Sequence, residues 1–242
     1  MACERCVCKA KYFVRLAHTF LSVGVPVSLL FKNTLLTRSL LLGENLVFGV
    51  MYVLLLVFSL SMYFMACCTD PGFLHVKMKQ PMRTKHCEDC GKCVRKYDHH
   101  CPWLEACIGE RNHKFFWLFL LSTAALIPWT FYISWNGIVY NPLWGTWLRS
   151  NILLLIDILI LVIGGFVVIG LLGFHTFLML RGLTTWEAAS RERITYLKYL
   201  DEDYNPFNEG LCKNMFYFLC SCRSRKWEGV YATHAHMDSS VA

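Results

Sequence analysis

The hydrophobic positions of the chain fall into four long stretches separated by polar segments. These stretches run from Tyr12 to Phe31, from Leu46 to Cys68, from Phe115 to Tyr140 and from Asn151 to Leu180. A helix needs roughly 20 apolar residues to cross the ~30 Å hydrocarbon core of a bilayer, and each stretch reaches that length. The pattern therefore predicts an α-helical multi-pass membrane protein with four transmembrane helices.

The first hydrophobic stretch allows a second interpretation, as a signal peptide that is removed. It has no small-residue cleavage site and is nearly as long as a full span, so we interpret it as a membrane anchor. Arg15 and His18 lie near its start, and the long stem of an arginine can carry its charge to the membrane interface.

The basic residues are distributed unevenly among the polar segments. The N-terminus, the middle loop and the C-terminal tail contain 21 of the 24 lysines and arginines, and the two other loops contain only Lys32, Arg38 and Arg149. The positive-inside rule then predicts that both termini and the middle loop are cytosolic. Topology and contact with lipid headgroups explain the net charge of +7, so we expect no nucleic-acid partner.

These spans divide the sequence into four predicted parts. Residues 1–69 form a cytosolic N-terminus with the first two transmembrane helices, and residues 115–180 form the third and fourth. Residues 70–114 form a cysteine-rich cytosolic segment, and residues 181–242 a cytosolic tail. The chain has 13 cysteines, but one with four spans is not a small disulfide-stapled domain. We therefore expect reduced cysteines that face the cytosol.

The cysteine-rich segment is dense in the residue types that bind metal ions. Back-to-back Cys-x-x-Cys steps place thiolates around one tetrahedral Zn²⁺, at a Zn–S distance of about 2.3 Å. A complete Cys₃His set consists of Cys87, Cys90, His100 and Cys107. Half of a second set consists of His86 and Cys93. Buried thiols and surface histidines without a metal are the alternative, which this density of ligand types disfavours. Because four protein ligands leave no open position, the predicted zinc is structural.

Three residues beside these ligands remain for chemistry, namely Asp98, His99 and Cys101. A histidine near a cysteine lowers the thiol pKa from its usual value of about 8.5, and a carboxylate can orient the imidazole. Neighbours in sequence need not be neighbours in space, so this hypothesis depends on a zinc ion that fixes His100. Cys101 precedes the third span by 14 residues, so we expect its thiolate at the membrane face, within reach of a fatty acyl chain.

Several motifs together resemble the DHHC-type protein S-palmitoyltransferases. The central one reads Pro81-x-Arg83-x-x-His86-Cys87, then Cys90, Cys93, Asp98-His99-His100-Cys101-Pro102-Trp103, Cys107-Ile108-Gly109 and Asn112. Outlying motifs are Asp70-Pro71-Gly72, Thr184-Thr185-Trp186-Glu187, and Asn205-Pro206-Phe207 with Gly210 and Asn214. The resemblance covers nearly the whole chain, and the tail with the run from Trp147 to Arg149 resembles one branch of the family in particular.

The resemblance implies a two-step reaction with palmitoyl-CoA as acyl donor and protein cysteines near the membrane as acceptors. Cys101 would be acylated first, with His99 as base and Asp98 polarising it, while His100 binds zinc. Trp103 is similar to a family tryptophan that contacts the acyl chain. Basic residues of the loop and tail would hold the CoA phosphates, and the motifs after the fourth helix would support the site. Family members are mostly found in Golgi and endoplasmic reticulum membranes.

One departure from the family pattern concerns the second metal site. Family members have another Cys-x-x-Cys upstream of Pro81, but Phe73 and Val76 stand at those positions, and only eight residues separate Gly72 from Pro81. We therefore expect either a shortened isoform of a family member or an incomplete sequence that lacks this pair. Substitute ligands are available in Cys67, Cys68, His75, Cys3 and Cys6. The alternative function is a catalytically weakened, zinc-containing membrane scaffold.

Two ionisable residues lie within the fourth span. An intramembrane carboxylate such as Asp157 is a functional candidate, but near the outer face of the membrane it can simply reach water. A channel or transporter that uses Asp157 has little support, because the spans otherwise lack polar residues. We expect His175, near the cytosolic end, to be an interfacial side chain.

Overall fold

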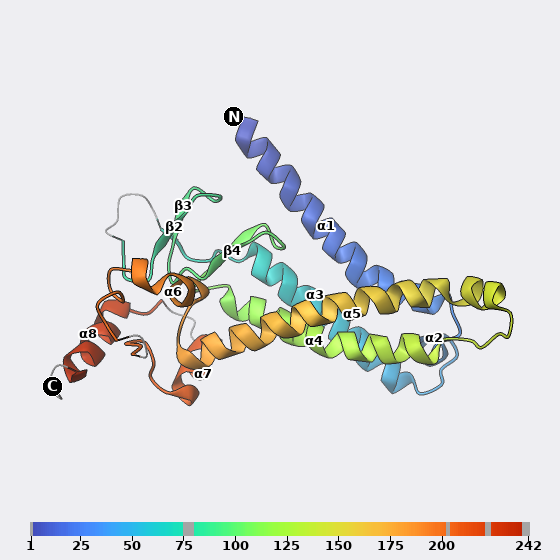
Figure 1. Cartoon of the computed structure of the whole chain (residues 1–242). Helices are drawn as coiled ribbons and strands as arrows, with labels where there is room; N and C mark the ends of the chain where they lie inside the picture. Colours follow the sequence, from blue (N-terminus) through green and yellow to red (C-terminus); the bar gives the residue numbers. More distant parts are fainter. Residues whose placement is uncertain (1, 75–79, 202–203, 221–223, 239–242) are drawn as a thin grey trace. The chain divides into compact units, whose positions relative to one another are not determined.

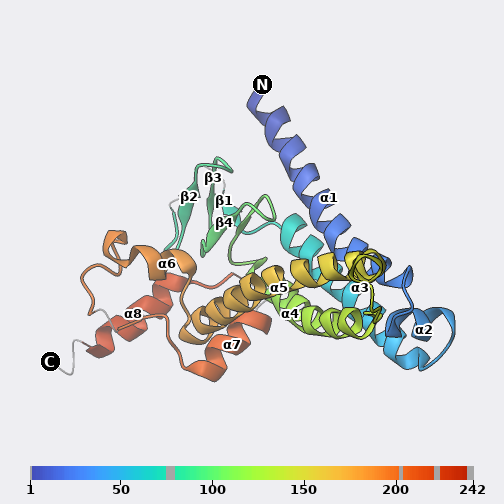
Figure 2. The ribbon, with the colours of Figure 1, turned by 45° about the vertical axis from the view of Figure 1, so that its right-hand side comes forward.

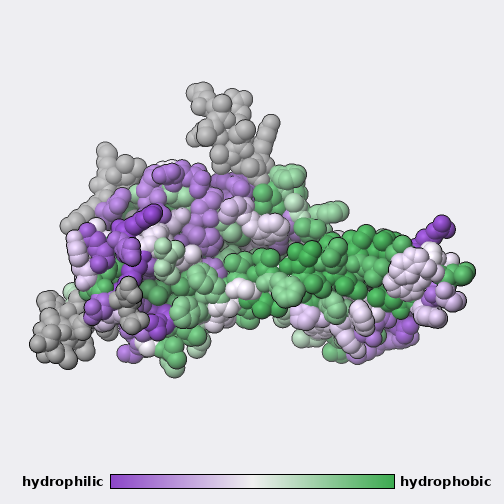
Figure 3. Space-filling view, viewed as in Figure 1, coloured by the Kyte–Doolittle hydropathy of each residue, from purple (hydrophilic) through white to green (hydrophobic). Residues whose placement is uncertain are grey.

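The computed structural model describes residues 2–74, 80–201, 204–220 and 224–238 (Figure 1). It contains four helices that are long and apolar enough to cross a membrane, as the sequence predicts. These are α1 (Ala2–Leu30, with the apolar part Lys11–Leu30), α3 (Leu46–Cys68), α4 (His113–Asn136) and α5 (Trp144–Arg181). A continuous hydrophobic surface covers α5 (Figure 3), where exposed side chains include Ile163, Phe166 and Val167. Such a surface is typical of contact with lipid.

The helix boundaries differ from three of the four predicted stretches. Only α3 has the predicted bounds, whereas α4 begins at His113 and ends at Asn136, where the N–H of Gly137 bonds back to the carbonyls of Ile133 and Ser134. The long helices α1 and α5 begin before the predicted apolar stretches, at Ala2 and Trp144. Hydropathy locates the part of a helix that is in lipid, but backbone hydrogen bonding decides where the helix begins and ends.

The chain divides into two compact units, of which the first comprises residues 1–63 and 118–172. In this unit α3, α4 and α5 run side by side (Figures 1 and 2), and the short helix α2 (Leu35–Leu41) follows α1. Hydroxyl pairs join α3 to α4, with 2.9 Å between Tyr52 Oη and Thr130 Oγ1 and 2.9 Å between Ser59 Oγ and Thr123 Oγ1. Interhelical polar bonds of this kind stabilise transmembrane bundles, because lipid offers these groups no other partner.

Asp157 lies inside this first unit and does not simply reach water. Its side chain is buried, and its Oδ2 atom accepts a hydrogen bond from the hydroxyl of Ser28 on α1. The expectation of a solvated carboxylate is therefore wrong. The polar group has an intramolecular partner, which is the usual arrangement for a polar residue within a span.

The second unit comprises residues 64–117 and 173–242 and contains all the motifs of the cysteine-rich segment. Its sheets are small and antiparallel. One has the order β1-β3-β2, with β1 (Phe73–Leu74), β2 (Lys85–Cys87) and β3 (Lys92–Val94). The other pairs β4 (His99–Cys101) with β5 (Ala106–Ile108). The unit also holds α6 (Thr185–Ser190), a 3₁₀ turn (Arg191–Arg193), α7 (Leu211–Cys220) and α8 (Trp227–Asp238).

Buried asparagines attach these short elements to the ends of the spans. The amide of Asn112 donates to the carbonyls of Ala66 and Cys107, both at 2.9 Å, and so joins β5 to the end of α3. Asn205 and Asn214 donate to the carbonyls of Arg181 and Leu180, at 2.5 and 2.8 Å. They satisfy carbonyls in the last turn of α5, which have no partner within the helix.

A buried ion pair lies at the centre of the unit. The side chain of Arg83 is 1% exposed, and its Nε and Nη2 atoms donate to the two carboxylate oxygens of Glu187, at 2.7 and 2.5 Å. Nη2 also donates to the carbonyl of Gly182, and the guanidinium lies 4.0 Å from the ring centre of Phe207. Arginine suits this site because its planar fork binds both carboxylate oxygens and stacks on an aromatic ring.

Substituting Arg83→Leu should strongly destabilise the second unit, because it leaves the Glu187 carboxylate buried without a counter-charge. We expect a loss of roughly 3–5 kcal/mol in the free energy of unfolding. The control Arg111→Gln removes the exposed ion pair between Arg111 and Asp70. That change should cost no more than about 1 kcal/mol. Chemical denaturation of the purified proteins in detergent measures both values, and equal losses would contradict this account.

Candidate active site

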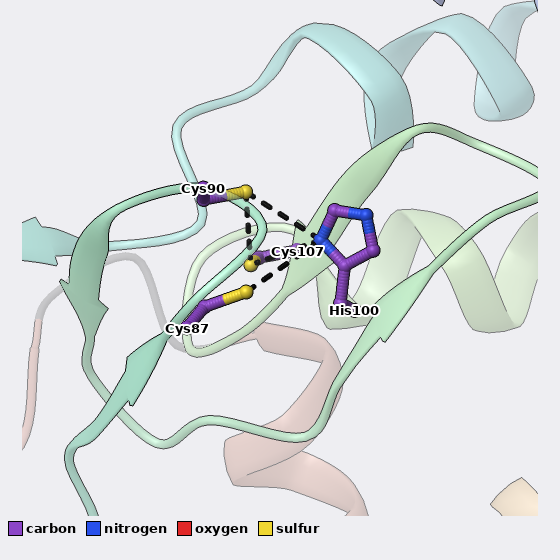
Figure 4. A group of neighbouring side chains, drawn as sticks. All are labelled: Cys87, Cys90, His100 and Cys107. Atoms are coloured by element: carbon purple, nitrogen blue, oxygen red, sulfur yellow. Dashed lines mark hydrogen bonds between the residues drawn. The ribbon is translucent and has the colours of Figure 1, made fainter. Parts of the chain in front are cut away.

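Four potential metal ligands converge in the second unit (Figure 4). The sulfur atoms of Cys87, Cys90 and Cys107 lie 3.7, 3.5 and 3.6 Å from Nδ1 of His100. Cys87 ends β2 and Cys90 lies in the turn between β2 and β3, while His100 and Cys107 are paired across β4 and β5. Two separate hairpins therefore supply two ligands each, as the sequence predicts for the complete set.

The spacing of these atoms fits a tetrahedral metal ion. For Zn–S and Zn–N distances of about 2.3 and 2.0–2.1 Å, the sulfur and nitrogen ligands of a tetrahedron stand about 3.6 Å apart. The three measured distances are within 0.1 Å of that value. A hydrogen bond from the Cys107 thiol outweighs partial burial and lowers the pKa of Cys90 to about 5, which favours the thiolate form that metals bind. This cluster can hold a metal ion.

The two residues of the half site also meet. His86 and Cys93 are paired across β2 and β3, with 3.5 Å between His86 Nδ1 and Cys93 Sγ. Among the residues that the structure describes, no third cysteine, histidine or carboxylate completes a cluster around them, and this includes Cys67 and Cys68. His75 and Val76 lie outside the described residues, as do the side chains of Cys3 and Cys6.

The alternation of strand β4 separates the metal ligand from its neighbours. Successive side chains of a strand point to opposite faces, so His99 and Cys101 share one face and His100 occupies the other. His100 points toward the three cysteines (Figure 4), whereas His99 forms side-chain hydrogen bonds with Asp98 and Cys101. The distance from His99 Nδ1 to Asp98 Oδ2 is 2.7 Å. The structure thus brings Asp98, His99 and Cys101 together.

The carboxylate of Asp98 is buried but fully hydrogen-bonded. Thr185 donates to it twice, from its backbone N–H at 2.8 Å and from its hydroxyl at 2.7 Å. Burial alone would raise the pKa of Asp98, but His113 and the hydrogen bond from His99 hold that pKa well below its usual range. Burial likewise opposes protonation of His99, yet its bonds to Asp98 and Cys101 raise its pKa to about 9. The geometry can therefore support a charged imidazolium beside a thiolate.

Two histidines that sequence reasoning did not assign to the site also face Asp98. Nδ1 of His113 and Nδ1 of His175 lie 3.7 and 3.9 Å from the carboxylate oxygens, and the two rings are 3.3 Å apart at their nearest nitrogens. The expectation that His175 is interfacial is wrong, since its side chain is only 3% exposed. The sequence did contain one indication that His175 is buried, namely its position within a span, because an ionisable side chain there commonly faces the protein interior.

The nucleophile candidate and the tryptophan next to it differ in exposure. Cys101 is buried, whereas Trp103, in the turn between β4 and β5, is 52% exposed. An exposed aromatic ring two residues from a buried thiol is open to contact with an apolar chain.

The comparisons with known proteins define the class of this enzyme. The profile of the DHHC palmitoyltransferase family matches residues 73–192. The chain belongs to this family, and it is a multi-pass membrane enzyme that transfers palmitoyl groups to protein cysteines.

Individual relatives extend the similarity over the whole chain. It is 35% identical to Palmitoyltransferase ZDHHC12 of Homo sapiens, over 95% of each chain, and 32% identical to Palmitoyltransferase ZDHHC12-A of Danio rerio, over 93% of this chain and 96% of that protein. Protein S-acyltransferase 10 of Arabidopsis thaliana is 37% identical over 62% of this chain and 42% of its own length. The human alignment covers 257 positions, more than the 242 residues here, so that relative contains residues without a counterpart in this chain. The predicted resemblance to one branch of the family is confirmed by the match to ZDHHC12 over nearly the whole chain.

Proposed function

We propose that Cys101 is the nucleophile and that it carries the acyl group between the two steps of the reaction. Its sulfur attacks the thioester carbonyl of palmitoyl-CoA, and the CoA thiolate leaves. A cysteine thiol of the protein substrate then attacks the new thioester and regenerates the Cys101 thiolate. The contact of His99 with both Asp98 and Cys101 is the observation that carries this proposal.

In this mechanism His99 holds and moves the proton. Its Nδ1 atom is bonded to Asp98, so Nε2 is the atom that accepts the proton of Cys101 in the first step. It gives this proton to the departing CoA thiolate, and in the second step the same atom accepts the proton of the substrate thiol, which leaves the imidazolium beside the regenerated Cys101 thiolate. Asp98 keeps the ring oriented and stabilises the imidazolium, as the third member of a nucleophilic triad does.

We propose zinc as the ion for Cys87, Cys90, His100 and Cys107, because a tetrahedral Cys₃His set is typical of structural zinc. When bound, the ion would fix the two hairpins around β4 and take no part in acyl transfer. His86 and Cys93 would contribute to a second ion only if other ligands join them. Trp103 is the candidate contact for the acyl chain at the site entrance.

The charge distribution supports the proposed topology, with both termini and the catalytic segment 70–114 in the cytosol. Substrates are then cytosol-facing proteins with cysteines close to the membrane, and fatty acyl-CoA is the donor. We propose Golgi or endoplasmic reticulum membranes as the location, on the basis of the family resemblance. A second candidate function, a weakened zinc-containing scaffold, is favoured by one observation, the half-formed site of His86 and Cys93.

The nucleophile assignment predicts that Cys101→Ser abolishes covalent labelling of the purified protein by a clickable palmitoyl-CoA analogue. Cys212→Ser, which removes an exposed tail cysteine, is the matched control and should retain the label. The acyltransferase function is supported if the wild type carries a label that hydroxylamine removes and Cys101→Ser carries none. No label on the wild type would favour the scaffold, and full label on Cys101→Ser would refute the assignment of Cys101.

The orienting role of Asp98 predicts that Thr185→Val slows self-acylation while Thr185→Ser does not. Valine keeps the shape of threonine but removes the hydroxyl that donates to the carboxylate. A hydrogen bond to a charged group contributes about 1.5–3 kcal/mol, which corresponds to a roughly 10- to 100-fold lower rate. A labelling time course with quenched samples measures the rate of self-acylation. An unchanged rate in Thr185→Val would contradict the orienting role of Asp98.

The metal assignment predicts one zinc ion per chain in purified protein, measured by elemental mass spectrometry against protein concentration. Cys90→Ser should lower the zinc content and the thermal stability, because binding of the metal stabilises the folded hairpins. Cys93→Ser is the matched control and should leave one ion in place. Two ions per chain in the wild type would show that substitute ligands complete the second site.

A further inference from the structure

A cavity of about 250 Å³ lies in the second unit, apart from the acyl-transfer residues. Its lining residues include some from the first turn of α4, from α7 and from the start of α8. Four cationic side chains contribute to its lining, namely Lys96, Arg111, Lys114 and Arg225. Aromatic rings, including those of Tyr217 and Trp227, form much of the rest.

Two of these cations have no carboxylate partner. Within the part of the chain that the structure describes, Lys96 and Lys114 form no ion pair, and their ammonium groups lie 5.0 and 5.4 Å from the centre of an aromatic ring. Lys96 also interacts at longer range with the carboxylates of Glu187, Glu110 and Asp98, which only partly offset its burial. Arg111 and Arg225 are each paired, with Asp70 and Glu209.

The cavity also contains one acid, Glu110, which is already neutralised. One of its oxygens accepts from Arg95 and the other from Trp227 Nε1 and the backbone N–H of Arg225. The charge left without a partner in the cavity is therefore positive.

Lys96 is the most costly of the unpaired charges. Burial, followed by repulsion from Arg83, lowers the pKa of Lys96 to about 8. Desolvating an ammonium group is unfavourable unless an anion compensates it, so a bound anion would remove this cost.

The backbone adds to the positive potential. Arg111, His113 and Lys114 line the cavity at the N-terminus of α4, where a long helix carries partial positive charge. The N–H groups of His113, Phe115 and Phe116 already bond to backbone carbonyls, so the helix dipole and the cationic side chains are what favour a phosphate group at this terminus.

The position of α7 indicates where the anion comes from. Phe218 packs on His113 in the first turn of α4, at 4.9 Å between ring centres. On the same helix Leu211, Met215 and Phe216 are exposed, which gives α7 an apolar face. An amphipathic helix beside the end of a span lies in the membrane interface, at the level of the lipid headgroups.

We propose that this cavity binds the phosphorylated headgroup of an anionic phospholipid from the leaflet that faces α7. The volume of the cavity fits a compact headgroup, because it is below the roughly 300–1,000 Å³ of pockets that enclose drug-sized ligands. CoA is larger than a drug-sized ligand and would not fit inside it. The acyl chains of the lipid would extend along α4 and α7 into the bilayer.

The test measures lipid binding to the full-length protein by native mass spectrometry, in a titration with phosphatidylinositol 4-phosphate or with phosphatidylcholine. The variants Lys96→Gln and Lys114→Gln each remove one unpaired cavity charge. Lys213→Gln is the matched control, because it removes the same charge from the exposed surface of α7 outside the cavity. Because Lys114 lies on α4 and Lys96 in the loop before β4, Lys114→Gln is an independent variant that remains informative if Lys96→Gln fails to fold.

Each cavity variant should weaken phosphoinositide binding by about fivefold, as expected from ~1 kcal/mol per basic residue near an anionic lipid, and Lys213→Gln should not. Equal binding of both lipids to the wild type, or equal loss in Lys213→Gln, would overturn the proposal. Competition experiments with inorganic phosphate and with CoA test whether the cavity prefers a lipid headgroup or a soluble phosphate compound. Displacement of the lipid by CoA, with the same dependence on Lys114, would show that the cavity holds a soluble phosphate ligand and would overturn the assignment to a lipid.

Discussion

The second unit depends on keeping the buried carboxylate of Asp98 charged. A desolvated carboxylate is unfavourable unless donors surround it, and here Thr185 supplies two hydrogen bonds while His99 supplies a third. The position of Thr185 depends in turn on the capping box of α6, in which Glu187 and Thr184 bond each other's backbone. Because Glu187 is also the partner of Arg83, one continuous chain of polar contacts connects the loop before β2, α6 and the site. A substitution that breaks any of these polar contacts should therefore alter the orientation of the His99 ring, because Asp98 holds that ring in place.

Strand β4 gives the four residues Asp98 to Cys101 their separate surroundings. Side chains alternate along the strand, so His99 and Cys101 lie on one side and His100 on the other. The cluster that can hold a metal ion and the proposed nucleophile therefore use different histidines of the same strand. Pairing of His100 with Cys107 across β5 brings the last ligand to the cluster. A three-residue strand has little stability of its own, so the contacts of His100 with Cys87 and Cys90 of the other hairpin help to hold it in place.

Sequence reasoning located the four spans, the complete ligand set and the grouping of Asp98, His99 and Cys101, because each depends on local spacing or on length. It did not locate His113 and His175, which stand 62 residues apart and meet only through the packing of α4 and α5 at their ends. Asp157 was misjudged for the same reason, since its partner Ser28 is 129 residues away. Helix ends were also missed, because Gly137 and the capping hydrogen bonds, and not hydropathy, determine them.

The half-formed site of His86 and Cys93 raises the question of what holds β3 in place of metal ligands. Phe73, at one position where the resemblance to the family implies a cysteine, lies in β1 and pairs with Val94, while Leu74 pairs with Cys93. The ring of Phe73 also packs under the ammonium of Lys92, at 4.8 Å, and the N–H of Arg95 bonds to the carbonyl of Gly72. Strand pairing and a cation–π contact thus provide β3 with a neighbour on the side away from β2. These contacts are weaker than two metal–thiolate bonds, so a metal ion held by Cys87, Cys90, His100 and Cys107 would contribute a larger share of the stability of both hairpins.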